Sequence, residues 1–281
     1  MTLRYRLVNV FAIPGNLFSG NPLCVFEDGS GLSEEQMQAL ALQFNLSETS
    51  FIVPPEDGAD VGVRIFTPRY EMAFAGHPTL GTAAVLRDLG RAGDSLRLSM
   101  PAGVIPLEST DDLWTLTALP GTLGAEYPLA DLAACVGLEA ADLVAPAQQV
   151  STGSPQVIAQ TRSVDALERA TGDAALMRRY AGMGTKGGET LVYLWCVTGD
   201  GTIEARALFT QGATAIEDPA TGSACSNLGA QLGAQGRSGQ WVVSQGAMTG
   251  RPSTLHLSVD PDRGVRVGGL VTAIGSGEVV L

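Results

Sequence analysis

The chain has 281 residues, 45% of them hydrophobic and 16% charged, enough apolar material for a buried core in one large domain or two of ordinary size. Its 17 Lys and Arg residues against 29 Asp and Glu residues give a net charge of −12. This balance excludes nucleic acid and anionic membranes as expected partners, because both bind basic faces. A small anionic substrate is compatible with it, since a local group of backbone N–H donors can oppose the overall field.

The cysteines predict neither a metal site nor a disulfide framework, because no two of them have Cys-x-x-Cys spacing. They are Cys24, Cys135, Cys196 and Cys225. The first residues lack the apolar core and cleavage site of a signal peptide, and no apolar run reaches transmembrane length. We therefore expect a cytoplasmic protein that binds no metal.

In the first half of the chain, short strands alternate with helices. Strands are expected at 7–11 and 23–26, around the turn-rich sequence IPGNLFSGNP. Ser33 and Gln36 have the spacing of a capping box and predict a helix that follows them. TSFIV and VGVRIFTP then predict strands, and GHPTLGTAAVLRDLG predicts a helix, with proline near its start and glycine past its end.

The second half repeats this order. QVIAQ, TLVYLWCVTG and TIEARALFT predict strands, and DPATGSACSNLGAQLG predicts a helix. His77-Pro78 corresponds to Asp218-Pro219 about half the chain later, and Ser47-Glu48-Thr49 corresponds to Gly188-Glu189-Thr190. We interpret these matches as an internal duplication with its boundary in a loop at 119–128.

The helices that follow His-Pro and Asp-Pro, at 79–89 and 220–232, are polar on no face, which is typical of helices buried on all sides. The sequence therefore predicts an α+β fold of two pseudo-symmetric domains, 1–121 and 122–281. Each is a curved, mostly antiparallel sheet wrapped around a central buried helix, with the active-site cleft between the domains. The last strand is expected to cross back to the first domain.

Two such helix starts have a chemical use. A helix N-terminus presents unpaired N–H groups and the positive end of the macrodipole, and therefore binds carboxylates. Gly81 and Gly222 would let a ligand approach the backbone. If both helix starts face one cleft, His77 and Asp218 stand on opposite walls, with Ser223 beside the second.

Four motifs, GNPLCVF, LSETSFI, FAGHPTLGTA and EDPATGSA, occur in this order, followed by GRPS at 250–253. Together they resemble the phenazine-biosynthesis PhzF-like family, whose fold is that of diaminopimelate epimerase. The resemblance covers the chain from its first strand to its last. It implies two similar domains around buried helices, no metal, no organic cofactor and a homodimer. The best-known member is an isomerase that moves a proton within trans-2,3-dihydro-3-hydroxyanthranilate.

The resemblance also implies the site residues. Glu48 matches the acid/base that takes a proton from carbon and returns it elsewhere, and His77, Asp218 and Ser223 match groups that bind and polarise the substrate. The further expected substrate contacts are Gly76, Gly222, Asn21 and Thr221. A glutamate of ordinary pKa, near 4.3, is a weak base towards a C–H bond. Burial of Glu48 would raise its pKa towards the working pH, where general-base catalysis contributes roughly 10²–10⁴-fold.

Each candidate also has a structural interpretation. Asp218 has the position of an N-cap before a proline, Ser223 suits tight helix packing, and Glu189 echoes Glu48 in the repeat. Arg251 suits either an anionic substrate or a surface ion pair. His256 lies in a strand-like segment and is expected to be structural.

Three functions remain open at this point: a proton-moving isomerase, an amino-acid-type epimerase or racemase, and a non-catalytic small-molecule binding protein with the same cleft. A racemase with two opposed thiols is disfavoured, because the positions that would hold the thiols read Gly-His and Gly-Ser.

Overall fold

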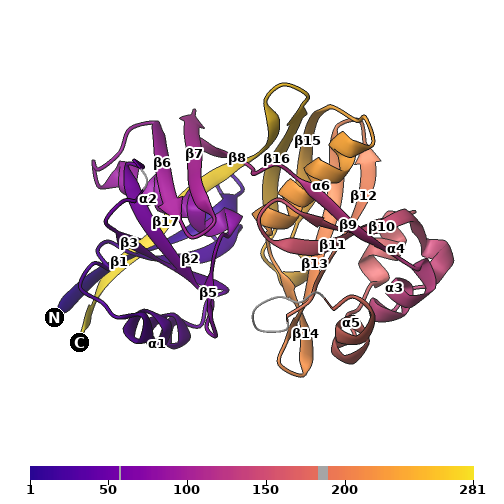
Figure 1. Cartoon of the computed structure of the whole chain (residues 1–281), viewed down its shortest axis with the longest axis horizontal. Helices are drawn as coiled ribbons and strands as arrows, with labels where there is room; N and C mark the ends of the chain where they lie inside the picture. Colours follow the sequence, from indigo (N-terminus) through magenta and orange to yellow (C-terminus); the bar gives the residue numbers. More distant parts are fainter. Residues whose placement is uncertain (57, 183–188) are drawn as a thin grey trace. The chain divides into compact units, whose positions relative to one another are not determined.

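The computed structural model describes residues 1–56, 58–182 and 189–281, and its internal contacts divide the chain into two compact units (Figure 1). Unit 1 comprises Met1–Thr117 and Gly268–Leu281, and unit 2 comprises Ala118–Val267. The final strand, β17 (Gly264–Val280), therefore contributes to both units. The expectation of a loop at 119–128 is wrong, because residues 122–127 form strand β9, which pairs antiparallel with β10.

Unit 1 is a sheet with helices on both of its faces. Its strands are β1 (Thr2–Ala12), β2 (Asn21–Phe26), β3 (Glu48–Val53), β4 (Val61–Phe66), β5 (Glu71–Met72), β6 (Ser95–Met100), β7 (Gly103–Thr110), β8 (Leu113–Thr117) and the end of β17, and its helices are α1 (Glu34–Phe44) and α2 (Gly76–Asp88). Strand pairing runs from β1 through β2, β3, β4, β6, β7 and β8 to β17, which pairs with β1 and closes the circuit. Pairs β2–β3 and β4–β6 are parallel, and pairs β1–β17, β1–β2, β3–β4, β6–β7 and β7–β8 are antiparallel. The two chain ends meet at one place in this unit (Figure 1), where the Met1 amino group donates to the Leu281 carbonyl at 2.7 Å.

Helix α1 begins as the sequence predicts. The Gln36 N–H donates to Ser33 Oγ, and the Ser33 N–H donates to Gln36 Oε1, so both halves of the capping box are present. Its buried residues pack against one face of the sheet. This cluster is Met37, Leu40 and Ala41 with Leu3, Cys24, Phe26, Phe51 and Phe66.

Helix α2 is buried throughout residues 76–86, as expected of a helix with no polar face, and it packs on β1, β2, β3, β4 and β8. Gly81 makes this close approach possible. A Cβ added there would lie 2.5 Å from Leu23 Cδ2 and 2.8 Å from Val10 Cγ2. The expectation that Gly81 admits a ligand is therefore wrong, because side chains of β1 and β2 fill the space.

Unit 2 has the same kind of sheet and two more α-helices than unit 1. Its strands are β9 (Thr122–Tyr127), β10 (Leu143–Ser151), β11 (Pro155–Thr161), β12 (Leu191–Gly199), β13 (Thr202–Gln211), β14 (Thr214–Asp218), β15 (Gly239–Gln245), β16 (Ser253–Asp260) and the start of β17, and its helices are α3 (Leu129–Cys135), α4 (Val164–Arg169), α5 (Ala174–Tyr180) and α6 (Gly222–Ala234), with short 3-10 turns at Ala140–Asp142 and Ala247–Thr249. Helix α6 is buried over most of its length and packs on β10, β11 and β16. Within the described part of the chain, no helix is both long enough and apolar enough to cross a bilayer.

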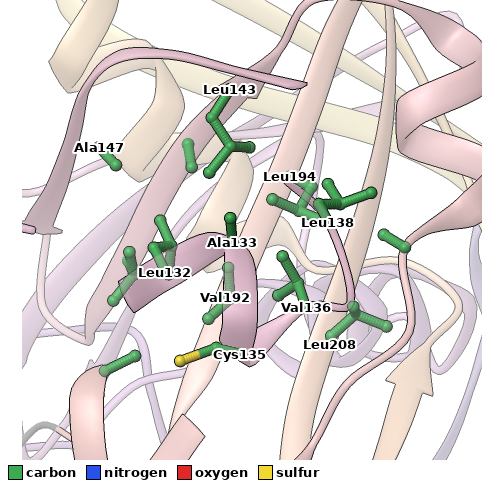
Figure 2. Close-up of a cluster of buried hydrophobic side chains, with 14 of the residues drawn as sticks. Leu132, Ala133, Cys135, Val136, Leu138, Leu143, Ala147, Val192, Leu194 and Leu208 are labelled. Atoms are coloured by element: carbon green, nitrogen blue, oxygen red, sulfur yellow. The ribbon is translucent and has the colours of Figure 1, made fainter. Parts of the chain in front are cut away.

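The opposite face of the unit 2 sheet carries a separate core. Side chains of α3 and of its C-cap residue Val136 pack against β10, β12 and β13, and Figure 2 shows Leu132, Ala133 and Val136 in one cluster with Val192 and Leu194. Successive residues of a strand point to opposite faces, so Tyr193 and Trp195 of β12 are buried on the other side. Both faces of this sheet are thus covered.

The strand pairings of the two units repeat each other. Parallel pairs β2–β3 and β4–β6 correspond to β11–β12 and β13–β15, and the antiparallel pairs between them match as well. An arginine on the central strand pairs with a glutamate of the following hairpin in each: Arg64 with Glu71 and Arg206 with Glu217. Two pseudo-symmetric halves are therefore confirmed.

The structure changes which residues correspond. Strand β3 begins at Glu48 and β12 begins at Leu191, so Glu189 lies two residues before the position that matches Glu48. Its neighbour Gly188 lies outside the described residues. Helices α2 and α6 both begin with glycine, so the residue that matches His77 is Ser223 and not Asp218.

Candidate functional site

The candidate residues of unit 1 meet at the start of β3 and the start of α2. Glu48 is the first residue of β3, and His77 is the second residue of α2. Their side chains approach to 3.2 Å between His77 Nδ1 and Glu48 Oε2. The imidazole is 4% exposed and the Glu48 side chain 17% exposed, so the carboxyl group keeps partial access from outside.

Burial determines the charge of His77. Desolvation lowers its pKa from 6.5 to about 3, and a hydrogen bond with the Pro22 backbone acts weakly in the opposite direction. His77 is therefore neutral near pH 7, and its 3.2 Å contact with Glu48 is not an ion pair. A neutral imidazole can donate from Nδ1 to a carboxylate, or in its other tautomer accept there from a carboxylic acid. Because proline offers only a carbonyl and Nε2 has no partner among the described residues, Nδ1 is the donor in the bond with Pro22, so the ring can offer its proton to a Glu48 carboxylate but not accept one from the acid.

Asn21 supports the turn that precedes Glu48. It is the first residue of β2 and is fully buried, and its Oδ1 accepts a hydrogen bond of 3.1 Å from Ser47 Oγ. Because Ser47 is the residue directly before Glu48, this bond ties the entry of β3 to β2.

The candidate residues of unit 2 meet where β14 leads into α6. Asp218 ends β14, Thr221 is the N-cap residue, and Gly222 is the first residue of the helix. The interpretation of Asp218 as an N-cap is therefore wrong, and Pro219 lies ahead of the helix and not in its first turn. Thr221 does not cap the helix with its side chain; its hydroxyl donates to Asp218 Oδ2 at 2.6 Å.

Gln245, at the end of β15, orients this pair. Its Oε1 accepts from the Thr221 backbone N–H at 3.2 Å, and its Nε2 donates to the Asp218 carbonyl at 2.9 Å and to Thr221 Oγ1 at 3.0 Å. Because the Thr221 hydroxyl accepts from Gln245, its own proton is available for the Asp218 carboxylate. The Tyr193 hydroxyl completes the network by donating to Gln245 Oε1 at 3.2 Å.

Ser223 occupies the second position of α6, as His77 does in α2. Its hydroxyl is buried, and Oγ accepts a hydrogen bond of 2.8 Å from Gln156 Nε2. Gly76 and Gly222 are the first residues of their helices, and neither helix has a capping bond from its N-cap side chain. Backbone N–H groups of both first turns are therefore left to other acceptors, as expected of an anion-binding helix start.

Sequence reasoning did not find Gln245, Tyr193 or Gln156. The one available signal was Gln156, because it follows Ser154-Pro155 where the first half has an apolar leucine after Asn21-Pro22. Gln245 and Tyr193 lie in ordinary strand sequences, and only the strand pairing brings them to Asp218.

Other candidates have structural partners or surroundings. Glu217 bonds Arg206 at 2.7 Å with both side chains nearly buried, which makes it a structural residue. Cys225 is fully buried in α6, and desolvation raises its pKa, so it is no thiolate nucleophile. Arg251 is half-buried, and burial lowers its pKa. Among the described residues, no three His, Cys, Asp or Glu side chains are grouped so as to hold a metal ion.

A family model for the phenazine biosynthesis-like proteins (PhzC-PhzF) matches residues 8–277. The chain belongs to this family. It is 36% identical over 279 residues to an uncharacterized isomerase of Pasteurella multocida, with 98% of this chain and 93% of the relative covered. It is 30% identical over 292 residues to the trans-2,3-dihydro-3-hydroxyanthranilate isomerase of Pseudomonas fluorescens, with 99% of each chain covered.

Solved structures agree with the family. A predicted epimerase of Pseudomonas aeruginosa has a TM-score of 0.81 and 31% identity, with 99% of each chain covered. A probable proline racemase of Agrobacterium radiobacter has a TM-score of 0.69 at 12% identity, covering 99% of this chain and 93% of that one, which shows a shared fold alone. The predicted diaminopimelate epimerase-like fold and the predicted enzyme class, an isomerase, are confirmed.

Proposed function

We propose that this isomerase moves a proton within a small anionic substrate like trans-2,3-dihydro-3-hydroxyanthranilate, without a cofactor, and that Glu48 is both the acid and the base. The observation that carries the proposal is the 3.2 Å contact between the Glu48 carboxyl group and an imidazole kept neutral by burial. The name of the Pseudomonas fluorescens relative, 30% identical over the whole chain, supports the substrate class.

The reaction needs one proton and no further reactant. The Glu48 carboxylate accepts a proton from a substrate carbon, and the electrons of that C–H bond delocalise into the adjoining unsaturated system. The resulting carboxylic acid then returns the proton to a second carbon, and the double bond has moved. The neutral His77 lies 3.2 Å from the carboxylate and would offer it an Nδ1–H before the first transfer. Proton transfer by a positioned group of this kind contributes roughly 10²–10⁴-fold to the rate.

The cluster of unit 2 would serve the same reaction by binding. The Ser223 hydroxyl and the first-turn N–H groups at Gly222 supply donors for substrate oxygens, and Asp218 supplies an acceptor whose orientation Thr221 holds. Donors aimed at developing negative charge stabilise it by roughly 3 kcal/mol each. Gly76 would contact the substrate beside Glu48, and the fully buried Asn21 would act by holding the turn at Ser47.

Solvent-deuterium incorporation tests the role of Glu48. The chain is incubated in D₂O with trans-2,3-dihydro-3-hydroxyanthranilate and related cyclic acids, and exchange is followed by mass spectrometry. Glu48→Gln should abolish exchange, because an amide cannot accept the proton. The matched control is Glu189→Gln, which changes the half-buried glutamate of the other repeat and should leave exchange intact. Full exchange by Glu48→Gln would defeat the mechanism.

An epimerase is the second candidate, favoured by the structure titled a predicted epimerase at 31% identity. An epimerase returns the proton to the opposite face of the same carbon, so its product differs in configuration and not in double-bond position. Chiral chromatography of the product separates the two reactions. We further propose that the protein is a cytoplasmic homodimer. Sedimentation of the purified chain tests its oligomeric state.

A further inference from the structure

We infer that Gln156 is a positioning residue that compels the Ser223 hydroxyl to act as a hydrogen-bond donor towards the substrate. This inference rests on the proposed function, in which Ser223 contacts the substrate. Gln156 lies near the start of β11 and is 4% exposed, so it has no direct access to a ligand of its own.

The direction of the hydrogen bonds begins at the backbone. Asn227 Oδ1 accepts from the Thr152 N–H at 2.7 Å, and its Nδ2 donates to the Ser154 carbonyl at 2.9 Å. A backbone N–H can only donate and a backbone carbonyl can only accept. The Asn227 amide therefore has one allowed orientation, because turning it over would set donor against donor and acceptor against acceptor.

This orientation passes to Gln156 and then to Ser223. Asn227 Nδ2 also donates to Gln156 Oε1 at 2.6 Å, which leaves Gln156 Nε2 facing Ser223 Oγ at 2.8 Å. An amide nitrogen is only a donor, so Oγ must accept from it. The single proton of the hydroxyl must then be directed elsewhere, and no described residue accepts it. Ser223 is thus held ready to donate to a bound oxygen.

The other half of the duplication shows that packing does not require this network. Leu23 occupies the position of Gln156, because it is paired with β1 as Gln156 is paired with β10. Gly81 occupies the position of Asn227, five residues after the first residue of its helix. Leucine fills the space above glycine there, and the site closes with apolar atoms.

Unit 2 therefore buries two amides at a place where the same fold closes with hydrocarbon. Buried amides stabilise only when they are fully hydrogen-bonded, and apolar replacement is often neutral or better. The residues at the two helix starts differ in role: His77 in unit 1 lies 3.2 Å from Glu48, whereas Ser223 in unit 2 accepts a hydrogen bond from Gln156. We therefore explain the buried Gln156 and Asn227 amides by their effect on Ser223, whose hydroxyl they compel to donate.

Gln156→Glu reverses the last bond without changing the shape of the side chain. Asn227 still donates to one carboxylate oxygen, but the other oxygen accepts, so the Ser223 proton turns inward. With the substrate found in the Glu48 experiment, kcat should fall on the order of 10²-fold, as for Ser223→Ala and for the loss of an oxyanion donor. In the Ser223→Ala background the same change should have little further effect, since there is no proton left to redirect.

Two further variants separate the direction of this bond from the burial of a charge and from the loss of a donor. Gln231→Glu introduces a carboxylate at a different buried glutamine, one that lies on α6, and should keep kcat within about threefold of wild type, a factor below 1 kcal/mol. Gln156→Met removes the donor without adding an acceptor and should reduce kcat less than Gln156→Glu, because the hydroxyl can still rotate towards the substrate. Gln156→Met also keeps the test decisive if the glutamate variant does not fold. In that case most of the fall in kcat caused by Gln156→Met must disappear when the same change is made in the Ser223→Ala background.

The inference is overturned if Gln156→Glu retains wild-type kcat, or if it reduces kcat by the same factor with and without Ser223. Impaired Ser223→Ala beside a fully active Gln156→Glu would overturn this inference alone. A fully active Ser223→Ala would overturn it together with the proposed role of Ser223, while the Glu48 mechanism would stand or fall on its own exchange experiment.

Discussion

Burial should keep His77 unprotonated in the folded chain, and the stability of unit 1 should therefore depend on pH. Its pKa is lowered to about 3 by burial, against 6.5 for the exposed group. Between these values the unfolded chain binds a proton that the folded chain does not, so stability falls as pH falls from 6.5 towards 3. Each pH unit costs about 1.4 kcal/mol, so the loss at pH 5 is about 2 kcal/mol.

Two measurements check this prediction. The chain has only two histidines, so NMR titration with His256→Asn as the assignment control reports His77 directly. About 1% of His77 should be protonated at pH 5, two units above its pKa. Urea unfolding can be followed by the fluorescence of Trp114, the single tryptophan of unit 1, in a Trp195→Phe/Trp241→Phe background. The free energy of unfolding should differ between pH 7.5 and pH 5 by about 2 kcal/mol less once His77→Asn is introduced.

The reasoning is refuted if His77 titrates at or above pH 6.5, or if His77→Asn retains the whole pH dependence. Either result would mean that the attraction of an ionised Glu48 carboxylate outweighs desolvation, since a nearby negative charge raises a histidine pKa.

Three more predictions concern buried contacts. Gly81→Ala should destabilise the protein by about 1–2 kcal/mol, because overpacking against Leu23 costs about 1–3 kcal/mol and the gain in helix propensity returns at most about 1; chemical denaturation measures it. Glu217→Gln should cost about 3 kcal/mol, because Arg206 is left as a charge with less than an eighth of its side chain exposed; thermal unfolding of the variant checks this. Cys225 should remain unmodified by a thiol reagent at pH 8 under native conditions, since burial raises its pKa, and mass spectrometry reads the result.

Each of these has a control and a contrary outcome. Gly233→Ala meets only Val259 at 3.3 Å and should be tolerated better than Gly81→Ala, and an equal cost would argue against overpacking. Glu278→Gln breaks an exposed pair and should cost under about 1 kcal/mol, so a loss as large as that of Glu217→Gln would contradict the burial argument. Rapid labelling of Cys225 would show that α6 opens in the native state.

Local chemistry determined much of this protein from sequence. The capping box at Ser33 depends on residues three apart, and the burial of α2 and α6 follows from helices without a polar face. Glu48 and His77 were expected as site residues only through the family's motifs, and the structure places the two side chains at 3.2 Å.

Tertiary structure decided what depends on strand register and on partners distant in the chain. Sequence similarity aligned Glu189 with Glu48 and Asp218 with His77, but a helix and a strand begin where their hydrogen bonds allow, and the matching residues are Leu191 and Ser223. The bonds from Gln156 to Ser223 and from Gln245 to Thr221 join β11 and β15 to the start of α6. No local pattern encodes them, because a glutamine amide has a defined direction only when the folded chain brings fixed backbone donors and acceptors against it.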